Sequence, residues 1–339
     1  MTTKIFKPSC QKDYSEIADL LQKGGIVAIP TETVYGLAGN ALDDSCVEKI
    51  YKAKGRPSDN PLIVHISDIS QWGDLVQDIS DSARALAEEF WPGPLTIILP
   101  KSEKVSDKVS GNLPTVAVRM PKNEVARKII DAAGFPLAAP SANLSGKPSP
   151  TCLKHVVDDL SGRVDAIVDG GESEMGVEST VITLAGDIPR LLRPGSITPE
   201  MLTRVLGEIE IDDAVYNKLA EGRQAASPGM KYKHYAPGAE VVLIKGDFSS
   251  YKRYIEAKAE NGCVALCFDE EKPELPIDSI TYGKKNDSSS QAKHVFDALR
   301  KVDELGYKKV FARIPDENGV GLAVFNRLVR AAAFNIIEV

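Results

Sequence analysis

The chain has 339 residues, which is long for a single hydrophobic core and sufficient for two domains. A hydrophobic content of 43% and a charged content of 26% are typical of an ordinary globular protein, and no apolar run reaches the ~18 residues that a membrane span needs. The net charge of −7 argues against a generic surface for binding nucleic acid.

The N-terminal residues and the cysteines favour the cytoplasm. The first residues of the chain lack the apolar segment and the cleavage site of a secretory signal. The five cysteines include no C-x-x-C pair, so they indicate neither a zinc site nor a disulfide framework. No cluster of histidine and acidic residues has metal-ligand spacing. We therefore expect a cytoplasmic protein in which no side chains form a metal site.

The N-terminal part of the chain alternates short apolar strands with helical patterns. The first helix is predicted to be capped by Asp13 with Glu16, to run through Leu21 and to end at a Gly-Gly pair. Further helices are predicted near 44–53, 81–90, 122–133, 151–160 and 198–206. Strands are predicted at 26–29, 61–66, 95–99, 115–120, 136–139, 165–169, 179–184 and 190–193. The strands outnumber the helices between them, which favours an α/β domain with a mixed, curved sheet.

The alternating pattern breaks around residues 208–238. Residues 222–239 contain no carboxylate, although several cations and two tyrosines lie there, Tyr232 and Tyr235. A plain linker would be rich in glycine and serine or mixed in charge. This composition suits a segment that docks on something anionic, and the alternative is a stiff, solvated spacer.

A second α/β unit begins at Ala239. Strands are predicted at 241–244, 263–266 and 310–313, and helices at 249–260, 289–304 and 321–333. Alternating strands and helices imply parallel pairing and a small doubly wound, Rossmann-like sheet. No G-x-G-x-x-G sequence follows the first strand, so dinucleotide binding is not supported. No catalytic constellation is visible in this unit.

Two loops next to predicted strands carry clustered polar residues. The segment 52–61 offers three cations, among them Lys54 and Arg56, in a turn stiffened by glycine and proline. The segment 140–148 offers Ser141, Asn143 and a lysine in a similar loop. Cations with short polar donors suit a ligand with several anionic oxygens, such as a nucleoside triphosphate. Neither loop has a Walker A sequence, and a basic turn alone is more often a solvated loop.

Further polar motifs follow along the N-terminal part. Thr31-Glu32-Thr33 comes directly after a short apolar strand, and residues 115–119 alternate polar and apolar side chains. Gly176-Val177-Glu178-Ser179-Thr180 and Leu192-Arg193-Pro194-Gly195 come later. Together with the two loops, these motifs resemble the YrdC-domain family in kind and in order. The segment 227–237 is similar to the linker of two-domain threonylcarbamoyl-AMP synthases in that family.

The resemblance implies a fold, an activity and partners. The fold is a curved mixed sheet with a central cavity (residues 1–209), a linker or lid over the active site (210–238) and a smaller Rossmann-like domain (239–339). The activity is that of a nucleotidyltransferase, which makes threonylcarbamoyl-AMP from L-threonine, bicarbonate and ATP with Mg²⁺. The product serves N6-threonylcarbamoyladenosine formation in tRNA, so downstream threonylcarbamoyl-transfer enzymes are the expected protein partners.

The resemblance also assigns roles to individual residues. It implies that the family's lysine–arginine and serine–asparagine pairs, the candidate catalytic residues, are Lys54, Arg56, Ser141 and Asn143. The ATP-binding residues it implies are Arg56, Asn60, Thr115, Ser141, Ser149, Arg193, Tyr232 and Tyr235. Those for threonine are Thr33, His65, Arg119, Ser179 and Ala139, the last through its backbone. Mg²⁺ is expected to be carried largely by ATP phosphates and water.

Several of these residues also permit a structural interpretation. A strand histidine such as His65 is usually a core residue with one satisfied nitrogen. Arg119 and Arg193 could clamp a carboxylate and a phosphate, or each could pair with a structural carboxylate. Glu32 could contact a metal or an amine, or it could be a turn carboxylate satisfied by backbone N–H groups.

Two other functions were weighed against the synthase. A carbamoyltransferase that handles carbamoyl-adenylate would carry zinc-finger cysteines and an acylphosphatase module, and neither is visible. A double-stranded RNA-binding module is disfavoured by the acidity of the chain and by the lack of aromatic–basic stripes. The sequence does not indicate the oligomeric state or the role of the second domain.

Overall fold

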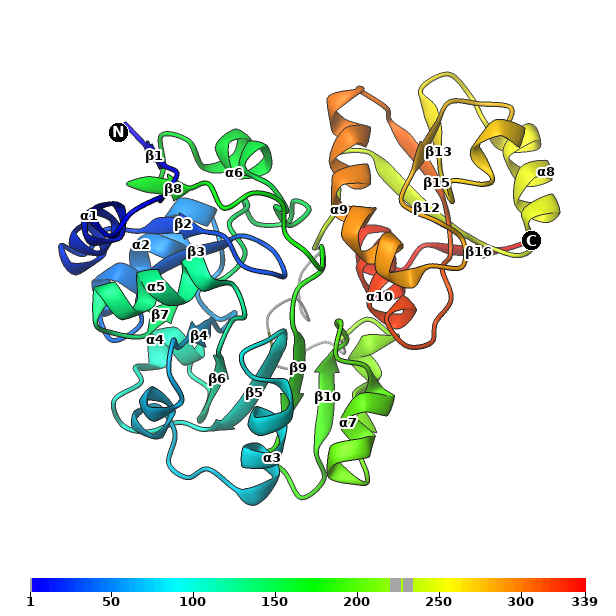
Figure 1. Cartoon of the computed structure of the whole chain (residues 1–339). Helices are drawn as coiled ribbons and strands as arrows, with labels where there is room; N and C mark the ends of the chain where they lie inside the picture. The colour runs from blue at the N-terminus through cyan, green and yellow to red at the C-terminus, as the bar shows by residue number, and fades with distance from the viewer. Residues whose placement is uncertain (1, 220–226, 228–233) are drawn as a thin grey trace. The chain divides into compact units, whose positions relative to one another are not determined.

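The computed structural model of the chain describes residues 2–219, 227 and 234–339. The chain divides into two compact units (Figure 1), which are described separately. The first comprises Met1–Ser145, Pro150–Glu174 and Glu178–Lys231, and the second comprises Gly146–Ser149, Met175–Val177 and Tyr232–Val339. Two short segments from within the N-terminal part therefore belong to the second unit.

The first unit is built on a mixed sheet. Its strands follow the order β1 (Lys4–Phe6), β8 (Ala166–Val168), β2 (Val27–Ile29), β3 (Gly36–Asn40), β7 (Leu137–Ala138), β4 (Ile63–His65), β6 (Thr115–Arg119), β5 (Leu95–Pro100), β9 (Thr180–Thr183), β10 (Arg190–Arg193) and β11 (Glu210–Ile211). In the centre, β4 is parallel to β6 and antiparallel to β7, while β5 is antiparallel to β6 and parallel to β9. The mixed sheet predicted from the sequence is confirmed.

Helices connect these strands. They are α1 (Gln11–Gln22), α2 (Asp44–Lys54), the 3-10 turn η1 (Ile69–Asp74), α3 (Asp81–Phe90), α4 (Asp107–Ser110), α5 (Glu124–Ala133), α6 (Leu153–Leu160), α7 (Pro199–Leu206) and the 3-10 turn η2 (Asp213–Val215). The predicted cap of the first helix is wrong by three residues. Cys10 is the N-cap, and Asp13 is the third helical residue, whose carboxylate accepts from the Cys10 backbone N–H at 3.1 Å.

The two faces of this sheet carry different side chains. One face packs its apolar residues, among them Val64, Ile97 and Val118, into the largest buried cluster of the unit. On the opposite face, α1 and α5 cover the end formed by β2, β7 and β8. Ile63, Ile98 and further along Val181 form a small apolar cluster on that same face. Since side chains alternate along a strand, polar residues two positions from these lie on the same side.

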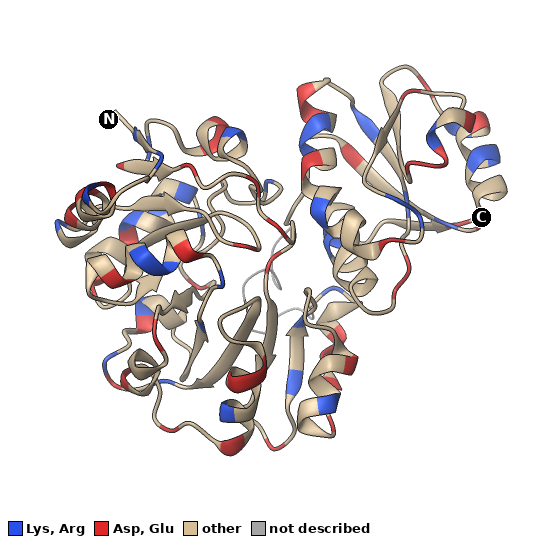
Figure 2. Ribbon diagram, in the orientation of Figure 1, with Lys and Arg blue, Asp and Glu red and all other residues tan. Residues whose placement is uncertain are grey.

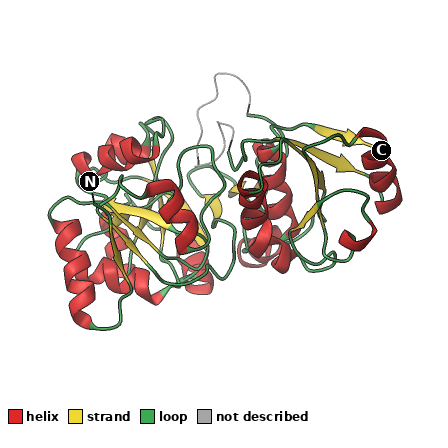
Figure 3. Ribbon diagram, turned by 90° about the horizontal axis from the view of Figure 1, so that it is seen from above, coloured by secondary structure: helices red, strands yellow, loops and turns green. Residues whose placement is uncertain are grey.

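The second unit contains a parallel sheet. Its strands follow the order β14 (Ser279–Thr281), β13 (Cys263–Cys267), β15 (Lys309–Arg313), β12 (Glu240–Lys245) and β16 (Ile336–Glu338). The helical elements are α8 (Phe248–Lys258), the 3-10 turn η3 (Lys272–Glu274), α9 (Ser288–Glu304) and α10 (Gly321–Ala331). Helix α8 covers one face of the sheet, and α9 and α10 pack together on the other (Figure 3). This arrangement confirms the predicted doubly wound, parallel architecture.

Some short elements were not predicted from the sequence. Strand β3 reads Gly36-Leu37-Ala38-Gly39-Asn40, which contains no β-branched residue and two glycines, so its local propensity for a strand is low. It forms because β2 and β7 pair with its two edges. Strands β1, β14 and β16 have three residues each, which is too short for a periodic signal.

The surface shows mixed charge. Lys and Arg alternate with Asp and Glu along helices such as α7 and α9 (Figure 2). Cys267 is buried, and Cys263 is partly buried. In the part of the chain that the structure describes, no helix has the length and hydrophobicity needed to cross a membrane.

Candidate functional site

A group of buried polar side chains, called the polar patch below, lies beside the small apolar cluster in the middle of the first unit's sheet. It consists of Glu32, Thr33, His65 and Arg119. Strands β4 and β6 pair in parallel with His65 opposite Arg119. Ile63 and Ala117, two residues earlier on each strand, both belong to the apolar cluster, so His65 and Arg119 project from the same face. The sheet register thus brings together two residues that are 54 positions apart in the sequence.

The Arg119 guanidinium is the most extensively bonded group of this patch. It donates to the Glu32 carboxylate at 2.7 Å, to Thr33 Oγ1 at 2.8 Å and to the Gly93 carbonyl at 3.2 Å. The side chains of both ions are less than 5% exposed. Arg119 therefore pairs with a structural carboxylate, which was one of the two interpretations that the sequence allowed.

Glu32 is held from two sides. Besides Arg119, its carboxylate accepts from the backbone N–H of Lys122 at 3.0 Å and of Asn123 at 3.3 Å, just before α5 begins. Burial by itself would raise the pKa of this carboxyl. The charge of Arg119 and the N–H of Lys122 outweigh it and hold the pKa below its usual value. Glu32 is thus an ionised partner of Arg119 and also accepts backbone N–H groups, as the turn interpretation predicted.

His65 is a buried, neutral histidine. Its Nδ1 lies 3.2 Å from the Ile63 carbonyl oxygen. A carbonyl only accepts, so Nδ1 carries the proton and Nε2 presents a lone pair. Burial is the main cause that lowers the pKa of His65 to about 3, and the nearby Arg119 charge lowers it further. The imidazole can therefore accept a hydrogen bond at neutral pH and adds no positive charge to the patch.

Ser179 and Arg193 form a second group on this face. Ser179 Oγ lies 2.7 Å from Thr96 Oγ1. Arg193 donates through Nε to the Ser179 carbonyl at 3.0 Å and through Nη2 to Ser179 Oγ at 3.1 Å. Arg193 is the last residue of β10 and is buried, so its guanidinium places a positive charge inside the unit at the end of this strand.

Lys54 is the last residue of α2, and it is buried. Its ammonium donates to the carbonyl oxygens of Ser141 and of Asn143, the latter at 2.6 Å, and to Asn143 Oδ1 at 3.4 Å. Only 2% of the residue is exposed. The alternative interpretation of this segment as a solvated basic turn therefore does not hold for Lys54. The residue ends α2, one position beyond the predicted helix, and Gly55 stops the helix at a φ of 61°.

The loop that Lys54 holds carries the two other candidate catalytic residues. Ser141 Oγ donates to Asn143 Oδ1 at 2.6 Å, and Asn143 Nδ2 donates to the Leu144 carbonyl at 2.8 Å. Tyr35 also holds this loop, since its backbone carbonyl accepts a hydrogen bond from the Ala142 N–H at 2.7 Å. The predicted lysine–serine–asparagine group therefore meets in space, although 86 residues separate Lys54 from the nearer end of the loop at Pro140.

Arg56 lies at the start of the following loop. Its guanidinium donates to the Asn60 carbonyl through Nε at 3.3 Å and to the Pro61 carbonyl through Nη2 at 3.0 Å. Asn60 is 1% exposed, and its side-chain Oδ1 has no hydrogen-bond partner among the described residues. An unsatisfied buried amide oxygen is rare in proteins and is compatible with a missing donor at this position.

The structure does not bring the remaining predicted site residues together in one group. Thr115 begins β6 and shares the face of Arg119, but four residues of strand put them about 13 Å apart. Ala139 donates its backbone N–H to the Ile63 carbonyl at 3.0 Å, so that N–H is already used. Ser149 and Tyr235 belong to the second unit. Tyr232 lies outside the described residues.

Thr96 was not predicted from the sequence, and Tyr35, part of the motif that begins at Thr31, was not assigned to the site. Thr96 interrupts the apolar strand β5 and is 0% exposed, so a hydroxyl in a buried strand was the available signal. Tyr35 Oη accepts from the Gly170 N–H at 3.1 Å and donates to the Gly171 carbonyl at 2.6 Å. Burial raises the pKa of this phenol to about 12, so it stays protonated and keeps the donor role.

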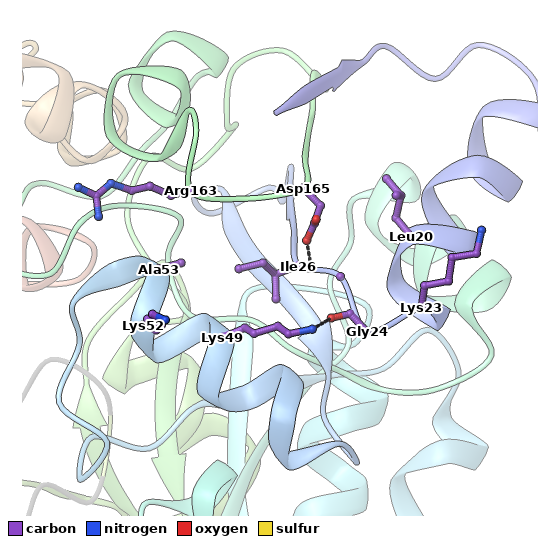
Figure 4. A pocket seen from close by; sticks show the side chains of 10 residues that line it. Leu20, Lys23, Gly24, Ile26, Lys49, Lys52, Ala53, Arg163 and Asp165 are labelled. Carbon is purple, nitrogen blue, oxygen red and sulfur yellow. Dashed lines mark hydrogen bonds between the residues drawn. The ribbon is translucent and has the colours of Figure 1, made fainter. Parts of the chain in front are cut away.

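A separate cavity of about 510 Å³ lies elsewhere in the first unit (Figure 4). It is lined by Leu20, Lys23, Gly24, Gly25, Ile26, Lys49, Lys52, Ala53, Arg163 and Asp165. Within it, Lys49 donates to the Gly24 carbonyl at 2.6 Å, and Asp165 accepts from the Ile26 N–H at 2.8 Å. None of the predicted site residues lines this cavity.

Metal-binding clusters are absent from the residues that the structure describes. Within that part of the chain, no three histidine, cysteine or acidic residues are arranged to hold a metal ion. The buried carboxylate of Glu32 is engaged by Arg119.

Two protein families match successive parts of the chain. The Sua5–YciO–YrdC family, described as telomere recombination, matches residues 19–195. The threonylcarbamoyl-AMP synthase C-terminal domain matches residues 197–333. The chain therefore belongs to the Sua5–YciO–YrdC family. It has the second domain as well, so the predicted resemblance to the two-domain members is confirmed.

Individual relatives span nearly the whole chain. The threonylcarbamoyl-AMP synthase of Pyrococcus abyssi is 47% identical over 328 residues, which is 95% of this chain and 94% of that protein. The Bacillus subtilis threonylcarbamoyl-AMP synthase is 46% identical over 330 residues, 96% of this chain and 94% of that protein. The crystal structure of P. abyssi Sua5 complexed with L-threonine covers 100% of both chains, with a TM-score of 0.92 and 43% identity.

Replacing Lys54 tests the role of its buried ammonium. Lys54→Met leaves two carbonyl oxygens without their charged donor, so we expect a loss of about 2–3 kcal/mol in the free energy of unfolding. Urea denaturation gives the value, and Lys52→Met, on the exposed face of the same helix, is the matched control. Equal stability of the two variants would contradict the structural role.

The buried neutral state of His65 predicts a pH dependence of stability. The folded-state pKa is about 3, below the ordinary 6.5, so the unfolded chain takes up a proton first as the pH falls. The contribution of neutral His65 to the free energy of unfolding is therefore complete above pH 6.5. It decreases below that pH, by up to about 1.4 kcal/mol per pH unit.

His65→Gln should therefore flatten the decline of the free energy of unfolding between about pH 6 and about pH 5, above the range where carboxyl groups titrate. Denaturation curves across this range measure the slope. His294→Gln, at an exposed histidine, should leave the slope unchanged. If His65→Gln has the wild-type slope, the imidazole is not held neutral by burial.

Proposed function

We propose that this chain is a threonylcarbamoyl-AMP synthase, which converts L-threonine, bicarbonate and ATP into threonylcarbamoyl-AMP, pyrophosphate and water. The observation that carries the proposal is identity of 46–47% over nearly the full length of two synthases, from P. abyssi and B. subtilis. A solved structure with a closely matching fold is that of P. abyssi Sua5 in complex with L-threonine. By class the enzyme is a nucleotidyltransferase.

The reaction requires two bond-forming steps. The threonine amine adds to bicarbonate and water leaves, which gives a carbamate. A carbamate oxygen then attacks the α-phosphorus of ATP, and pyrophosphate leaves. These steps need charge neutralisation and close positioning of the reactants, and they need no covalent bond to the protein. A patch of buried cations and hydroxyls without a nucleophilic triad suits this chemistry.

The nucleotide is assigned to the loops around α2 and to the strand β10. Lys54, Arg56 and Arg193 supply buried positive charges, and the triphosphate would replace some of the carbonyl acceptors that these groups now use. The Asn60 amide and the Ser141 hydroxyl add neutral donors, and Asn143 supports the carbamoyl or phosphate oxygens. Thr115, Ser149, Tyr232 and Tyr235 complete the proposed ATP contacts.

Threonine is assigned to the polar patch on the sheet. Arg119, already bonded to Thr33, presents a guanidinium that suits the substrate carboxylate. The neutral His65 can accept a hydrogen bond from the substrate at Nε2 and does not repel its amine. Ser179 and the backbone of Ala139 are the remaining proposed contacts.

Mg²⁺ is proposed to enter with ATP. The described residues supply no acidic cluster for it, so its ligands would be phosphate oxygens and water. When bound, it would neutralise phosphate charge and ease the departure of pyrophosphate.

The proposed product is an activated intermediate for tRNA modification. Its mixed anhydride must be consumed by an enzyme that transfers the threonylcarbamoyl group to adenosine 37, and the setting would be the cytoplasm. Residues 1–209 would form the catalytic domain, 210–238 the linker and 239–339 the second domain. The carbamoyltransferase and RNA-binding alternatives are not favoured, because the full-length relatives are named as synthases.

A panel of amino acids tests the proposed function and the threonine contacts together. Pyrophosphate release from ATP and bicarbonate should be fastest with threonine, slower with serine and slowest with valine. A site that hydrogen-bonds the hydroxyl rejects an analogue that lacks it more strongly than one that lacks only a methyl group.

Omission of bicarbonate is the control, because an adenylating enzyme that does not make a carbamate would still release pyrophosphate without it. Equal rates with valine and threonine would refute the side-chain contacts. A failure to release pyrophosphate with every amino acid would refute the synthase itself.

A further inference from the structure

Two short segments leave the first unit and return to it next to proposed site residues. Gly146–Ser149 begins three residues after Asn143, and Met175–Val177 ends two residues before Ser179. Both segments belong to the second unit. Two or three residues of chain span at most about 7–10 Å, so a shift in either segment moves the neighbouring site residue.

Gly176 packs its backbone directly on α9. Its φ of +77° lies in the left-handed region that favours glycine. A Cβ added there would lie 2.4 Å from the Lys293 Cα and 2.5 Å from the Ala292 carbonyl oxygen. These are backbone atoms of a helix, which cannot move aside as a flexible side chain can. Only glycine lets the segment approach this closely.

The other segment is tied to the same helix by a hydrogen bond. Arg300 Nη2 donates to the Pro148 carbonyl at 2.6 Å, and the arginine is 8% exposed. The Gly146 carbonyl also accepts from the Ala236 N–H at 2.9 Å. Both partners of this segment lie in the second unit.

The two attachments lie on one face of α9. Lys293 and Arg300 are seven residues apart, which is close to two helical turns, so they project from the same side of the helix. Helix α9 is itself fixed to the rest of the second unit by packing against α10 and β14. One rigid helix thus carries both segments.

We propose that α9 of the second unit positions the loops of the active site, with Arg300 and Gly176 as positioning residues. The inference rests on the proposed function, because it uses the assignment of Ser141 and Asn143 to ATP and of Ser179 to threonine. It gives helix α9 a role in positioning groups that are proposed to contact substrate. The Arg300 attachment supports the ATP loop, and the Gly176 attachment supports the threonine contact.

The first test compares two glycines of one loop. Gly171 has nearly the same φ, +80°, but a Cβ there meets nothing within 4 Å. Gly171→Ala therefore reproduces the conformational strain without the collision with α9. We expect Gly176→Ala to raise the KM for threonine about tenfold relative to Gly171→Ala, since a small misplacement of a binding group has effects of this size or larger.

The second test uses α9 itself. Arg300→Ala should raise the KM for ATP about tenfold and leave the KM for threonine closer to wild type, and Arg300→Lys should recover part of the loss, because an ammonium can still donate to Pro148. Lys301→Ala is the matched control, since Lys301 is an exposed neighbour that pairs with Asp297. This variant should keep both constants.

The split between KM and kcat separates positioning from a merely structural role. A variant that only unfolds more easily loses active enzyme and therefore kcat, with KM unchanged. Unchanged KM values for both substrates in active Arg300→Ala enzyme would overturn the proposal, even if Gly176→Ala fails to fold. A wild-type enzyme that releases no pyrophosphate with threonine would instead refute the proposed function, so the two failures are distinguishable.

Discussion

The buried pair of Arg119 and Glu32 is the interaction on which the candidate site depends. Moving two charges out of water is costly, and the cost is offset only where each charge is paired and its remaining hydrogen-bonding groups are satisfied. Here Arg119 has three different acceptors and Glu32 has three donors. Removing either ion would leave the other charge buried, so the pair fixes the loop of Thr33 against β6.

The same logic applies to the other cations of the first unit. Lys54, Arg56 and Arg193 are all buried and donate mainly to backbone carbonyl oxygens. The backbone carbonyl oxygens among their partners are acceptors that carry no formal charge. These hydrogen bonds fix the positions of the three cations in the folded chain. The loops that they hold are also the loops proposed to bind substrate.

The sequence determined the order of elements and the identity of most polar residues. Helices such as α3 and α9 were predicted within about two residues because their apolar periodicity and caps are local signals. The sequence motifs indicated the lysine–arginine and serine–asparagine pairs. Strand β3 and the hydroxyl of Thr96 were missed, since one forms only through pairing and the other lies within an apolar run.

Only the tertiary structure decided which of these residues meet and in what state. The register of β4 with β6 puts His65 beside Arg119, and burial then keeps the imidazole neutral. Lys54, at the end of α2, is buried and donates hydrogen bonds to the carbonyl oxygens of Ser141 and Asn143, a contact that the sequence does not show. Composition and periodicity carry no information about such contacts, because burial and pairing arise from residues far apart in the chain. The sequence determined the chemistry that was available, and the packing of the sheet decided how it is held.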